Sequence, residues 1–397
     1  MSAAPVGTAA APLRVGIVAG EHSGDLLGAA LIAALRERVP ALECFGVAGP
    51  KMIAAGCEAW AGAEALSVMG LAEVLRHLPR LLRLRAQLTR RFLAARPDVF
   101  IGIDSPEFNL TLAGRLKRAG IRTVQYVSPQ VWAWRQGRVR TIARDCDLLL
   151  CLLPFESEFY AQHAVRAEFV GHPLADQIPL EVDVAAARAA LGLASGARVI
   201  ALLPGSRVAE VARLAAPFTQ AAGWIRERRP GIEFVAPMAS AAVRDCFERQ
   251  VAQAAEKSLI RIVDGQSHRV LAAADAAIVA SGTATLETLL SGKPMVVAYK
   301  VSWLTAFLVR TLGLVKVPYF SQPNLLAGRR LVPEFSQGQV TGPALGAALL
   351  DEMEDAAHLA ELRREFARIH RQLRRGGAAR AAAAVLECVA RRGDAPA

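Results

Sequence analysis

The sequence lacks several features that would each place a protein in a distinct class. Only six of its 397 residues are cysteines, with no C-x-x-C pair and no histidine nearby at zinc-ligand spacing. No uncharged run reaches the roughly 18 residues of a membrane-spanning helix. The first residues also lack the basic start and apolar block of a signal peptide. We therefore expect free thiols rather than disulfides, no zinc site, no membrane-spanning helix and no secretion.

Composition excludes a disordered chain and indicates the kind of partner. Apolar residues make up 53% of the sequence and charged residues 21%, as in folded proteins. At roughly 150 residues per domain, the length predicts two to three domains. Lysine and arginine (47) exceed aspartate and glutamate (36) by 11, which favours a nucleic acid, a phosphorylated metabolite or an acidic membrane surface. Aromatic and basic residues do not interleave as in nucleic-acid-binding modules, so we expect no nucleic acid.

Short apolar segments alternate with longer stretches rich in alanine, leucine and arginine, which favour helices. These short segments are mostly continuous apolar runs and do not alternate, as expected for strands that are covered on both faces. The expected strands are residues 14–19, 99–103, 122–127, 148–153, 199–203, 232–236, 276–280 and 295–299. Repeated strand–helix order predicts an α/β protein with two Rossmann-like, doubly wound parallel sheets that face each other across a cleft.

The domain boundary is expected where a Gly-His-Pro turn (residues 171–173) is followed by a new β/α series that starts at Val199. The last part of the chain has the pattern of helices only. We therefore expect an N-terminal domain (1–178), a C-terminal domain (179–372) and a helical tail (373–397) that packs back on the N-terminal domain.

Ligands of doubly wound sheets bind beyond the carboxyl ends of the strands, and two early loops suit such a site. The loop of residues 20–25 places glycines at the start of a helix, which favours phosphate binding, although many such loops serve packing only. Asp104 ends the strand of residues 99–103, where a carboxylate is able to accept a proton. The alternative for Asp104 is a helix N-cap, since aspartate and serine are preferred there.

A further loop contains two of the five tryptophans, Trp132 and Trp134. They flank a turn instead of repeating at core spacing. They form either a flat apolar wall for a sugar ring or acyl chain, or a pair in the core.

Two loops of the C-terminal half join a strand to a helix through small residues. Backbone N–H groups at such turns, together with one arginine fork, favour the binding of a diphosphate. Glu287, one turn into the second helix, either binds ribose hydroxyls or complements the helix dipole. The residues expected to hold the diphosphate are Gly205, Ser206, Arg207, Ser281, Gly282, Thr283 and Thr285.

Two stretches have the composition of a membrane-docking surface. Between Glu73 and Asp98 there are seven arginines and no carboxylate. An amphipathic helix is expected there, with Pro79 in its first turn and an apolar face of Leu81, Leu84, Leu88 and Phe92. This helix lies either on anionic lipid or on its own sheet. The apolar residues 301–309 are either a buried helix or a patch that docks acyl chains.

Taken together, these strings resemble one family, the lipid-A-disaccharide synthases of the bacterial lipopolysaccharide pathway. The resemblance extends from about residue 14 to residue 330 and, more loosely, through the C-terminal helices. It rests on GEHSGD (20–25), VAGPKM (47–52), VMGLAEVL (68–75), PDVFIGIDSPEFN (97–109), YVSPQVWAWR (126–135), LLPGSR (202–207), SGTATLE (281–287) and SQPNLLAGR (321–329).

The resemblance implies a GT-B fold and an inverting, metal-independent glycosyltransferase with no cofactor. Its substrates would be UDP-2,3-diacylglucosamine and 2,3-diacylglucosamine 1-phosphate, and its products a β-1,6-linked disaccharide 1-phosphate and UDP. The resemblance also implies a cytoplasmic enzyme that associates peripherally with the anionic inner membrane, with a homodimer as a possibility. The alternative is an isomerase like the UDP-N-acetylglucosamine 2-epimerases, which share a similar fold.

The resemblance also distributes roles among the candidate residues. Asp104 would be the base for the acceptor hydroxyl, with Glu107 and Asp25 as alternatives. The C-terminal turns would hold the UDP diphosphate, Glu287 the ribose, and Asn324 the nucleotide or donor sugar. The acceptor side would be formed by Ser23, Gly24, Asp25, Gln130 and Trp132.

Overall fold

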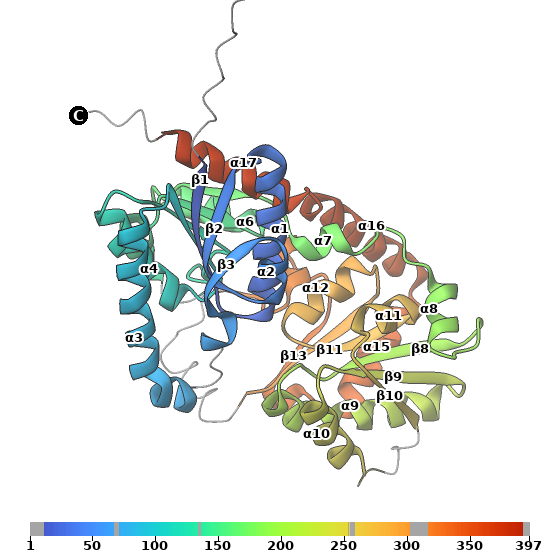
Figure 1. Ribbon diagram of the computed structural model, residues 1–397. Helices are drawn as coiled ribbons and strands as arrows, with labels where there is room; N and C mark the ends of the chain where they lie inside the picture. Colours follow the sequence, from blue (N-terminus) through green and yellow to red (C-terminus); the bar gives the residue numbers. More distant parts are fainter. Residues whose placement is uncertain are drawn as a thin grey trace, which may run out of the picture. The chain divides into compact units, whose positions relative to one another are not determined.

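The computed structural model describes residues 12–66, 71–133, 136–252, 254, 259–301 and 317–391, with backbone only for 71–77. The chain forms two compact units (Figure 1). Unit 1 comprises Met1–Pro173 and Arg375–Ala397, and unit 2 comprises Leu174–Arg374. The C-terminal segment thus belongs to the same unit as the N-terminus. The apolar segment 302–316 and the start of the VMGLAEVL string (residues 68–70) lie outside the described residues.

Unit 1 is built on a seven-stranded sheet in which all neighbouring strands are parallel. The strand order is β3-β2-β1-β4-β5-β6-β7. The strands are β1 (Leu13–Ala19), β2 (Leu42–Ala48), β3 (Cys57–Gly62), β4 (Val99–Ile103), β5 (Arg122–Tyr126), β6 (Leu148–Cys151) and β7 (Ala167–Phe169).

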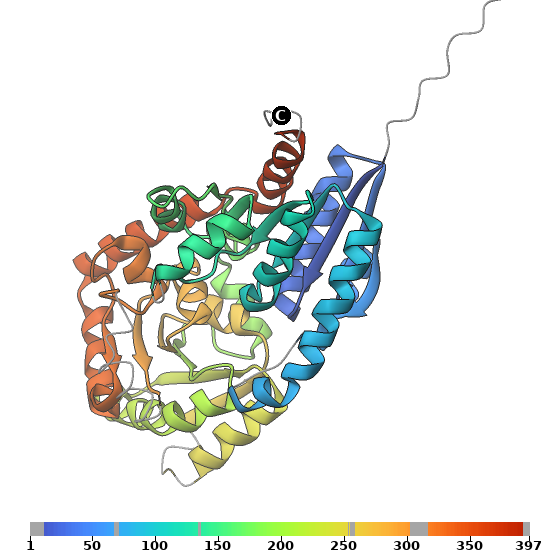
Figure 2. The ribbon, with the colours of Figure 1, turned by 90° about the vertical axis from the view of Figure 1, so that its left-hand side faces the viewer.

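Helices cover both faces of this sheet (Figure 2). They are α1 (His22–Arg38), α2 (Pro50–Ala54), α3 (Leu71–Ala95), α4 (Pro106–Arg118), α5 (Val139–Asp145), α6 (Pro154–Ala161) and α17 (Gly377–Ala390). Val15 and Ile17 of β1 pack on one face with α1 and α17, whereas Val18 packs on the other face with Phe92 of α3. Because both faces are buried, the strands read as continuous apolar runs.

Unit 2 contains a six-stranded parallel sheet of order β10-β9-β8-β11-β12-β13. Its strands are β8 (Arg198–Leu203), β9 (Ile232–Met238), β10 (Ile260–Asp264), β11 (Ala276–Ala280), β12 (Met295–Tyr299) and β13 (Glu334–Ser336). Its helices are α8 (Val184–Ala190), α9 (Val208–Arg228), α10 (Ala241–Ala252), α11 (Ser267–Ala273), α12 (Thr283–Leu290), α14 (Gln322–Ala327), α15 (Gly342–Glu354) and α16 (Ala356–Leu373), preceded by α7 (Pro173–Gln177).

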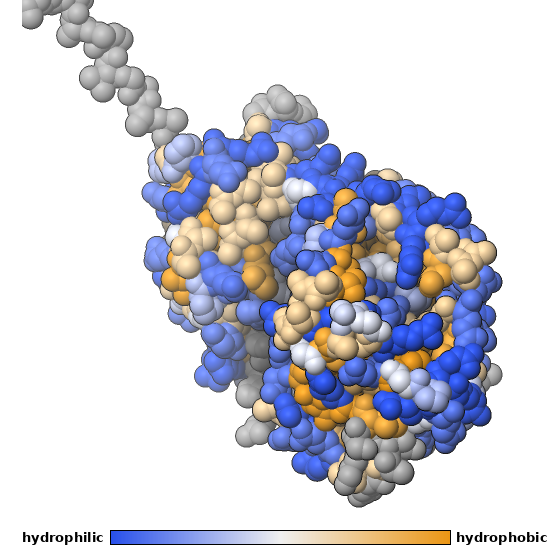
Figure 3. All heavy atoms as spheres, turned by 90° about the vertical axis from the view of Figure 1, so that its right-hand side faces the viewer, coloured by the Kyte–Doolittle hydropathy of each residue, from blue (hydrophilic) through white to orange (hydrophobic). Residues whose placement is uncertain are grey.

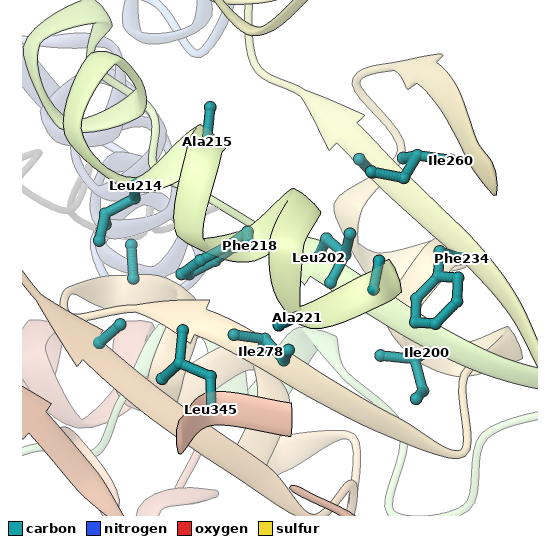
Figure 4. Packing of buried hydrophobic residues seen from close by; sticks show 14 of the residues in the cluster. Ile200, Leu202, Leu214, Ala215, Phe218, Ala221, Phe234, Ile260, Ile278 and Leu345 are labelled. Carbon is teal, nitrogen blue, oxygen red and sulfur yellow. The ribbon is translucent and has the colours of Figure 1, made fainter. Parts of the chain in front are cut away.

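The core of unit 2 joins its central strands to α9 and α15. Leu202 of β8, Ile278 of β11, Phe218 of α9 and Leu345 of α15 belong to one cluster and are fully shielded from solvent (Figure 4). Burying a side chain of this size stabilises the fold by about 1.5–3 kcal/mol. This packing holds the carboxyl ends of β8 and β11, where the candidate loops begin, on a rigid base.

The predicted doubly wound α/β class is confirmed, and every expected strand is present. The sequence reading missed β2, β3, β7, β10 and β13. Four of these five strands are the edges of the two sheets. Edge strands are covered less completely, and these are short or carry polar residues, so they lack the continuous apolar run that marks a central strand.

The arginine-rich helix differs from its prediction in one respect. Pro79 does not lie in the first turn, because α3 begins at Leu71 and contains Pro79 in its interior. The long apolar face that follows outweighs the local cost of an interior proline. Leu88 and Phe92 on that face are buried, and Leu81 and Leu84 pack against the same cluster.

The distribution of exposed apolar residues is relevant to membrane binding. On the face drawn in Figure 3, hydrophilic residues separate the hydrophobic ones into several areas. Along α3, Leu78, Leu82 and Leu93 are exposed beside the arginines. No helix among the described residues is long and apolar enough to cross a bilayer.

Candidate active site

Unit 2 has a cavity of about 280 Å³ at the carboxyl ends of β8, β9 and β11. Chain order reverses between β8 and β11, because β8 continues to β9 on one side while β11 lies on the other. Such a switch point is where doubly wound sheets bind ligands. The wall is formed by Leu203, Gly205, Ser206, Glu210, Pro237, Met238, Ala239, Gly265, Ser267, Ala280, Ser281, Gly282, Thr283, Ala284 and Glu287.

The turn after β8 brings the start of α9 to this cavity. Gly205 has a φ of +124°, and a Cβ on it would lie 2.7 Å from Oε2 of Glu210. Only glycine therefore permits this close turn. The free N–H groups of the first turn of α9 begin at Val208, beside Ser206. The turn thus places Gly205 and Ser206 on the cavity wall, next to the start of α9.

Arg207 is not part of the cavity wall. Its side chain is 68% exposed, and Nη1 lies 3.7 Å from Oε1 of Glu210, which does line the cavity. The guanidinium is thus held loosely next to the cavity by an exposed ion pair, which contributes little to stability. A ligand phosphate in the cavity would compete with Glu210 for this arginine.

The turn after β11 forms the other side of the cavity. Ser281 and Thr283 line it, and Gly282, with a φ of +152°, caps α12. The Ser281 hydroxyl donates to the carbonyl of Phe320 at 2.9 Å. Thr285 is buried, and its hydroxyl donates to the Gly282 carbonyl at 2.8 Å. The structure therefore places Thr285 beneath the turn, where it shapes the backbone, and not on the wall.

Glu287 lies on the wall, one turn into α12. Burial raises the pKa of its carboxyl, and the positive charge of His268 acts in the opposite direction. The carboxylate is therefore a poorly solvated acceptor that would gain from hydrogen bonds donated by a ligand. This environment agrees better with binding hydroxyl groups than with a solvated first-turn acid.

Asn324 does not lie on the cavity wall. It is fully buried, and its amide nitrogen donates to the carbonyl of Val332 (3.0 Å) and to Glu334 Oε1 (2.8 Å). Its amide oxygen accepts from the N–H groups of Leu331 (2.7 Å) and Val332 (2.9 Å). The chain itself uses both ends of this amide, so the structure favours a role in holding the loop around α14.

Unit 1 has its own cavity of about 260 Å³, beyond the carboxyl ends of β4 and β5. Its wall is formed by Asp104, Pro106, Glu107, Val127, Ser128, Pro129, Gln130, Val131 and Arg138. Two predicted site residues, Asp104 and Gln130, thus lie on one wall, although they come from different loops.

The three carboxylates considered as the base differ in what they already bind. Glu107 forms a two-pronged ion pair with Arg138. Asp25 is buried and accepts the N–H groups of Lys51 and Met52, each at 2.9 Å, at the start of α2. The carboxylate of Asp104 has no hydrogen-bond or ion-pair partner within the described part of the chain. Of the three, Asp104 is the one left available to a ligand.

The backbone at Asp104 is strained. Asp104 (φ 51°) and Ser105 (φ 41°) are both left-handed, and so is Val127 (φ 72°) on the neighbouring loop. Each such residue costs about 1–3 kcal/mol and persists where the surrounding structure enforces it, often at active sites. The N-cap of α4 is Ser105, without a side-chain cap, so the alternative that Asp104 is an N-cap is wrong.

The other residues predicted for the acceptor side lie apart from this wall. Trp132 is buried and donates from Nε1 to Glu156 Oε1 at 3.2 Å, which agrees with its alternative as a core residue. Trp134 lies outside the described residues. Gly24 is buried, Ser23 is exposed, and Asp25 borders a separate cavity of about 200 Å³ with Gly20 and His22.

Sequence reasoning missed several residues that shape these cavities. Gly265 and Ser267 line the cavity of unit 2 after β10, and they escaped notice because that edge strand was not predicted. Away from both cavity walls, the buried Glu156, which accepts from Trp132 and from the Leu153 N–H at 3.0 Å, also carried no motif signal. Burial raises the pKa of its carboxyl. Among the described residues, no group of three metal-ligating side chains gathers.

Solved structures with the same fold define the class. The calicheamicin glycosyltransferase aligns with a TM-score of 0.58 at 17% identity, covering 96% of this chain and 99% of its own. A UDP-GlcNAc 2-epimerase from Neisseria meningitidis, bound to UDP-GlcNAc, aligns with a TM-score of 0.62 at 11% identity. The alignment covers 95% of this chain and 100% of that structure's chain. The two parallel-sheet units therefore have the GT-B fold.

The family follows from sequence comparison. The family model described as "Lipid-A-disaccharide synthetase" matches residues 15–389. The lipid-A-disaccharide synthase of Pseudomonas aeruginosa (strain UCBPP-PA14) is 53% identical over 380 residues, 96% of this chain and 99% of that protein. The synthase of Alkalilimnicola ehrlichii is 52% identical over 376 residues, which cover 94% of this chain and 98% of that protein. The chain belongs to the lipid-A-disaccharide synthase family and is a glycosyltransferase; the epimerase alternative is not favoured.

Proposed function

We propose that this chain transfers 2,3-diacylglucosamine from its UDP derivative to the 6-hydroxyl of 2,3-diacylglucosamine 1-phosphate. The products are a β-1,6-linked disaccharide 1-phosphate and UDP, and the anomeric configuration inverts. The observation that carries this proposal is the family match over residues 15–389. The two cavities at the carboxyl ends of the two sheets supply the chemistry that such a transfer needs.

The cavity of unit 2 is the proposed site of the UDP part of the donor. Its wall combines the glycine turns after β8 and β11 with the starts of α9 and α12, whose N–H groups favour negative charge. Arg207 stands beside it and would turn from Glu210 to the diphosphate. These groups stabilise the charge of departing UDP, so the proposal includes no metal ion. Glu287 accepts the ribose hydroxyls.

Asp104 is the proposed base. Inversion requires a base that removes the proton of the attacking hydroxyl while the diphosphate leaves from the opposite face of the sugar. Asp104 lines the cavity of unit 1, and its carboxylate has no partner among the described residues, whereas Glu107 is paired with Arg138. Gln130 on the same wall contributes to acceptor binding. Unit 1 is thus the acceptor domain and unit 2 the donor domain.

Because both proposed substrates carry acyl chains, the enzyme acts at the cytoplasmic surface of a membrane in this proposal. The predicted apolar face of α3 is used in the core of unit 1. The proposed docking surface is therefore the opposite side of α3, where Leu78 and Leu82 are exposed next to Arg80 and Arg83. A C-terminal exchange between two subunits, which would make a homodimer, is compatible with this proposal but not required by it.

The direct test is a UDP-release assay with the two acylated sugars. We expect UDP to appear only when 2,3-diacylglucosamine 1-phosphate is present with the UDP-linked donor, together with a disaccharide detected by mass spectrometry. Conversion of the UDP-sugar in the absence of acceptor would support the isomerase instead. No consumption of the donor with the acceptor present would contradict the proposed transfer.

A further inference from the structure

Two buried side-chain amides converge on the backbone of Asp104. Asn109 of α4 is fully buried, and its Nδ2 donates to the Asp104 carbonyl at 2.9 Å. Gln125 of β5 is 1% exposed, and its Nε2 donates to the same carbonyl at 3.0 Å. One carbonyl oxygen thus accepts two amide hydrogen bonds, from residues on two different elements.

The same amides also hold the neighbouring backbone. Gln125 Nε2 lies 3.3 Å from the carbonyl oxygen of Val127, the left-handed residue on the adjacent loop. Asn109 Nδ2 lies 3.2 Å from the carbonyl oxygen of Ile103. The strained backbone on both sides of the cavity is therefore tied to one pair of buried NH₂ groups.

The need for these donors follows from the backbone conformation. Asp104 still donates its N–H to the carbonyl of Tyr126 at 2.9 Å, as the last rung of the β4–β5 pairing. Its left-handed φ then turns the chain out of the sheet, so its own carbonyl leaves the ladder and needs other donors when buried. Side-chain amides from α4 and β5 are these donors.

Gly102 of β4 leaves room for the side chains of Asn109 and Gln125. A Cβ on Gly102 would lie 2.7 Å from Cβ of Asn109 and 2.9 Å from Oε1 of Gln125. Glycine at that position allows both amides to lie against β4. A larger residue at Gly102 would displace at least one of them.

Stability alone gives a weak reason for Asn109. Its Oδ1 is buried and has no hydrogen-bond partner within the described part of the chain. A buried acceptor without a donor is destabilising, and an apolar residue of the same shape avoids this cost. The amide is better explained by what its NH₂ group does for the Asp104 carbonyl.

We infer that Asn109 and Gln125 are positioning residues that hold the left-handed turn at Asp104 and so aim its carboxylate into the cavity of unit 1. This inference rests on the proposed role of Asp104 as the base. The amides do not touch substrate. They act through the backbone of Asp104, because both bind its carbonyl and neither binds its carboxylate.

The test is a mutant cycle in the full-length protein with both acylated sugars as substrates. Asn109→Leu and Gln125→Met remove the NH₂ groups while nearly preserving shape. Each is expected to lower kcat by about 10-fold or more, because misplacing a catalytic group by a fraction of an ångström is costly. The KM for the UDP-linked donor should stay unchanged. Calorimetry with UDP alone should give the wild-type affinity.

The decisive arm places the same substitutions on an Asp104→Asn background. Since the amides act through the Asp104 carboxylate, Asn109→Leu should lower kcat by less than about twofold there. An undiminished 10-fold loss on that background would show a general structural effect and overturn the inference. Wild-type kcat in both single variants would overturn it as well. Two variants on different elements keep the test valid if one of them fails to fold.

Thr123→Val is the matched control. Thr123 is fully buried on the same strand as Gln125, and its hydroxyl donates to Asp147 Oδ2 at 3.1 Å at the opposite end of β5. Even if Thr123→Val loses as much thermal stability as Gln125→Met does, we expect its kcat to stay within about twofold of wild type. A fall as large as that of Gln125→Met would assign the effect to strand stability and contradict the inference. If Asp104→Asn alone retains full turnover, the proposed base fails, which is a separate outcome.

Discussion

Both cavities lie beyond the carboxyl ends of the strands of a parallel sheet, but they are built from different groups. In unit 2 the wall combines the glycine turns after β8 and β11, next to the starts of α9 and α12, with the side chains of Glu210 and Glu287. In unit 1 the wall presents the ion pair of Glu107 and Arg138 and, on left-handed backbone, Asp104, whose carboxylate has no partner among the described residues. Backbone donors suit a fixed anion, whereas a positioned carboxylate suits proton transfer. The difference suggests that one unit binds the leaving group and the other activates the acceptor.

The largest effect that would separate the two units is expected for Asp104→Asn. An amide has nearly the same shape but cannot accept the proton, so turnover should fall by about 10²-fold or more. UDP affinity, measured by calorimetry, should remain that of wild type because the proposed UDP site lies in unit 2. Unchanged turnover would remove Asp104 as the base and return attention to Glu107.

The corresponding test of unit 2 is Arg207→Ala. Loss of the guanidinium should weaken UDP binding by about 10-fold, because a charge-assisted hydrogen bond to phosphate contributes about 1.5–3 kcal/mol. Because the side chain is exposed and only loosely paired with Glu210, the melting temperature should hardly change. Calorimetry with UDP measures the first effect. Equal affinity would exclude a diphosphate role.

A smaller effect is expected for Glu287→Gln. Burial raises the pKa of this carboxyl in the folded protein. The folded state therefore binds its proton more tightly than the unfolded state does, and this stabilising contribution is lost as the pH rises from about 4.3 through the raised pKa. Glutamine removes the buried charge, so the variant should unfold at a higher temperature than wild type at pH 7, with a smaller difference at pH 4.

The same variant should bind UDP a few-fold more weakly, because one charged acceptor for the ribose is lost. Thermal unfolding at the two pH values and calorimetry separate the two effects. Lower stability at pH 7 would contradict the assignment of the pKa shift to burial.

The smallest expected effect concerns membrane docking by unit 1. Raising the salt from about 0.1 M to 1 M shortens the screening length from about 10 Å to 3 Å, and we expect this to release the protein from anionic vesicles. Exchange of Arg80 and Arg83 for glutamine should weaken binding in low salt, as measured by co-sedimentation. Binding that resists high salt would favour the apolar stretch 301–309 as the docking segment.

Features that depend on local pattern were predictable from the sequence. Central strands such as β4 and β11 are continuous apolar runs, and Asp104 and Ser281 follow them directly. Position at the end of a central strand was enough to select both as site candidates. Gly205 was selected as part of a turn between a strand and a helix, and its φ of +124° is a conformation that glycine adopts without strain.

Features that depend on distant partners were not predictable. Asp25 was assigned to the acceptor, but its carboxylate binds the start of α2. Asn324 was assigned to the donor, but its amide is used by residues 331–334. Nothing local in the sequence separates a polar residue that binds a ligand from one that binds its own chain. Gln125 was not predicted either, because it lies within a strand and its partner, the Asp104 carbonyl, is distant in the sequence.

The most direct test of the division between the two units is hydrogen–deuterium exchange of the full-length protein with UDP alone. We predict slower exchange in residues 203–210 and 280–287, whose N–H groups would bind the diphosphate. We predict no change in residues 104–109 and 127–131 until 2,3-diacylglucosamine 1-phosphate is added. Protection of residues 104–131 by UDP alone, without protection of the two turns in unit 2, would contradict the proposed division between the units.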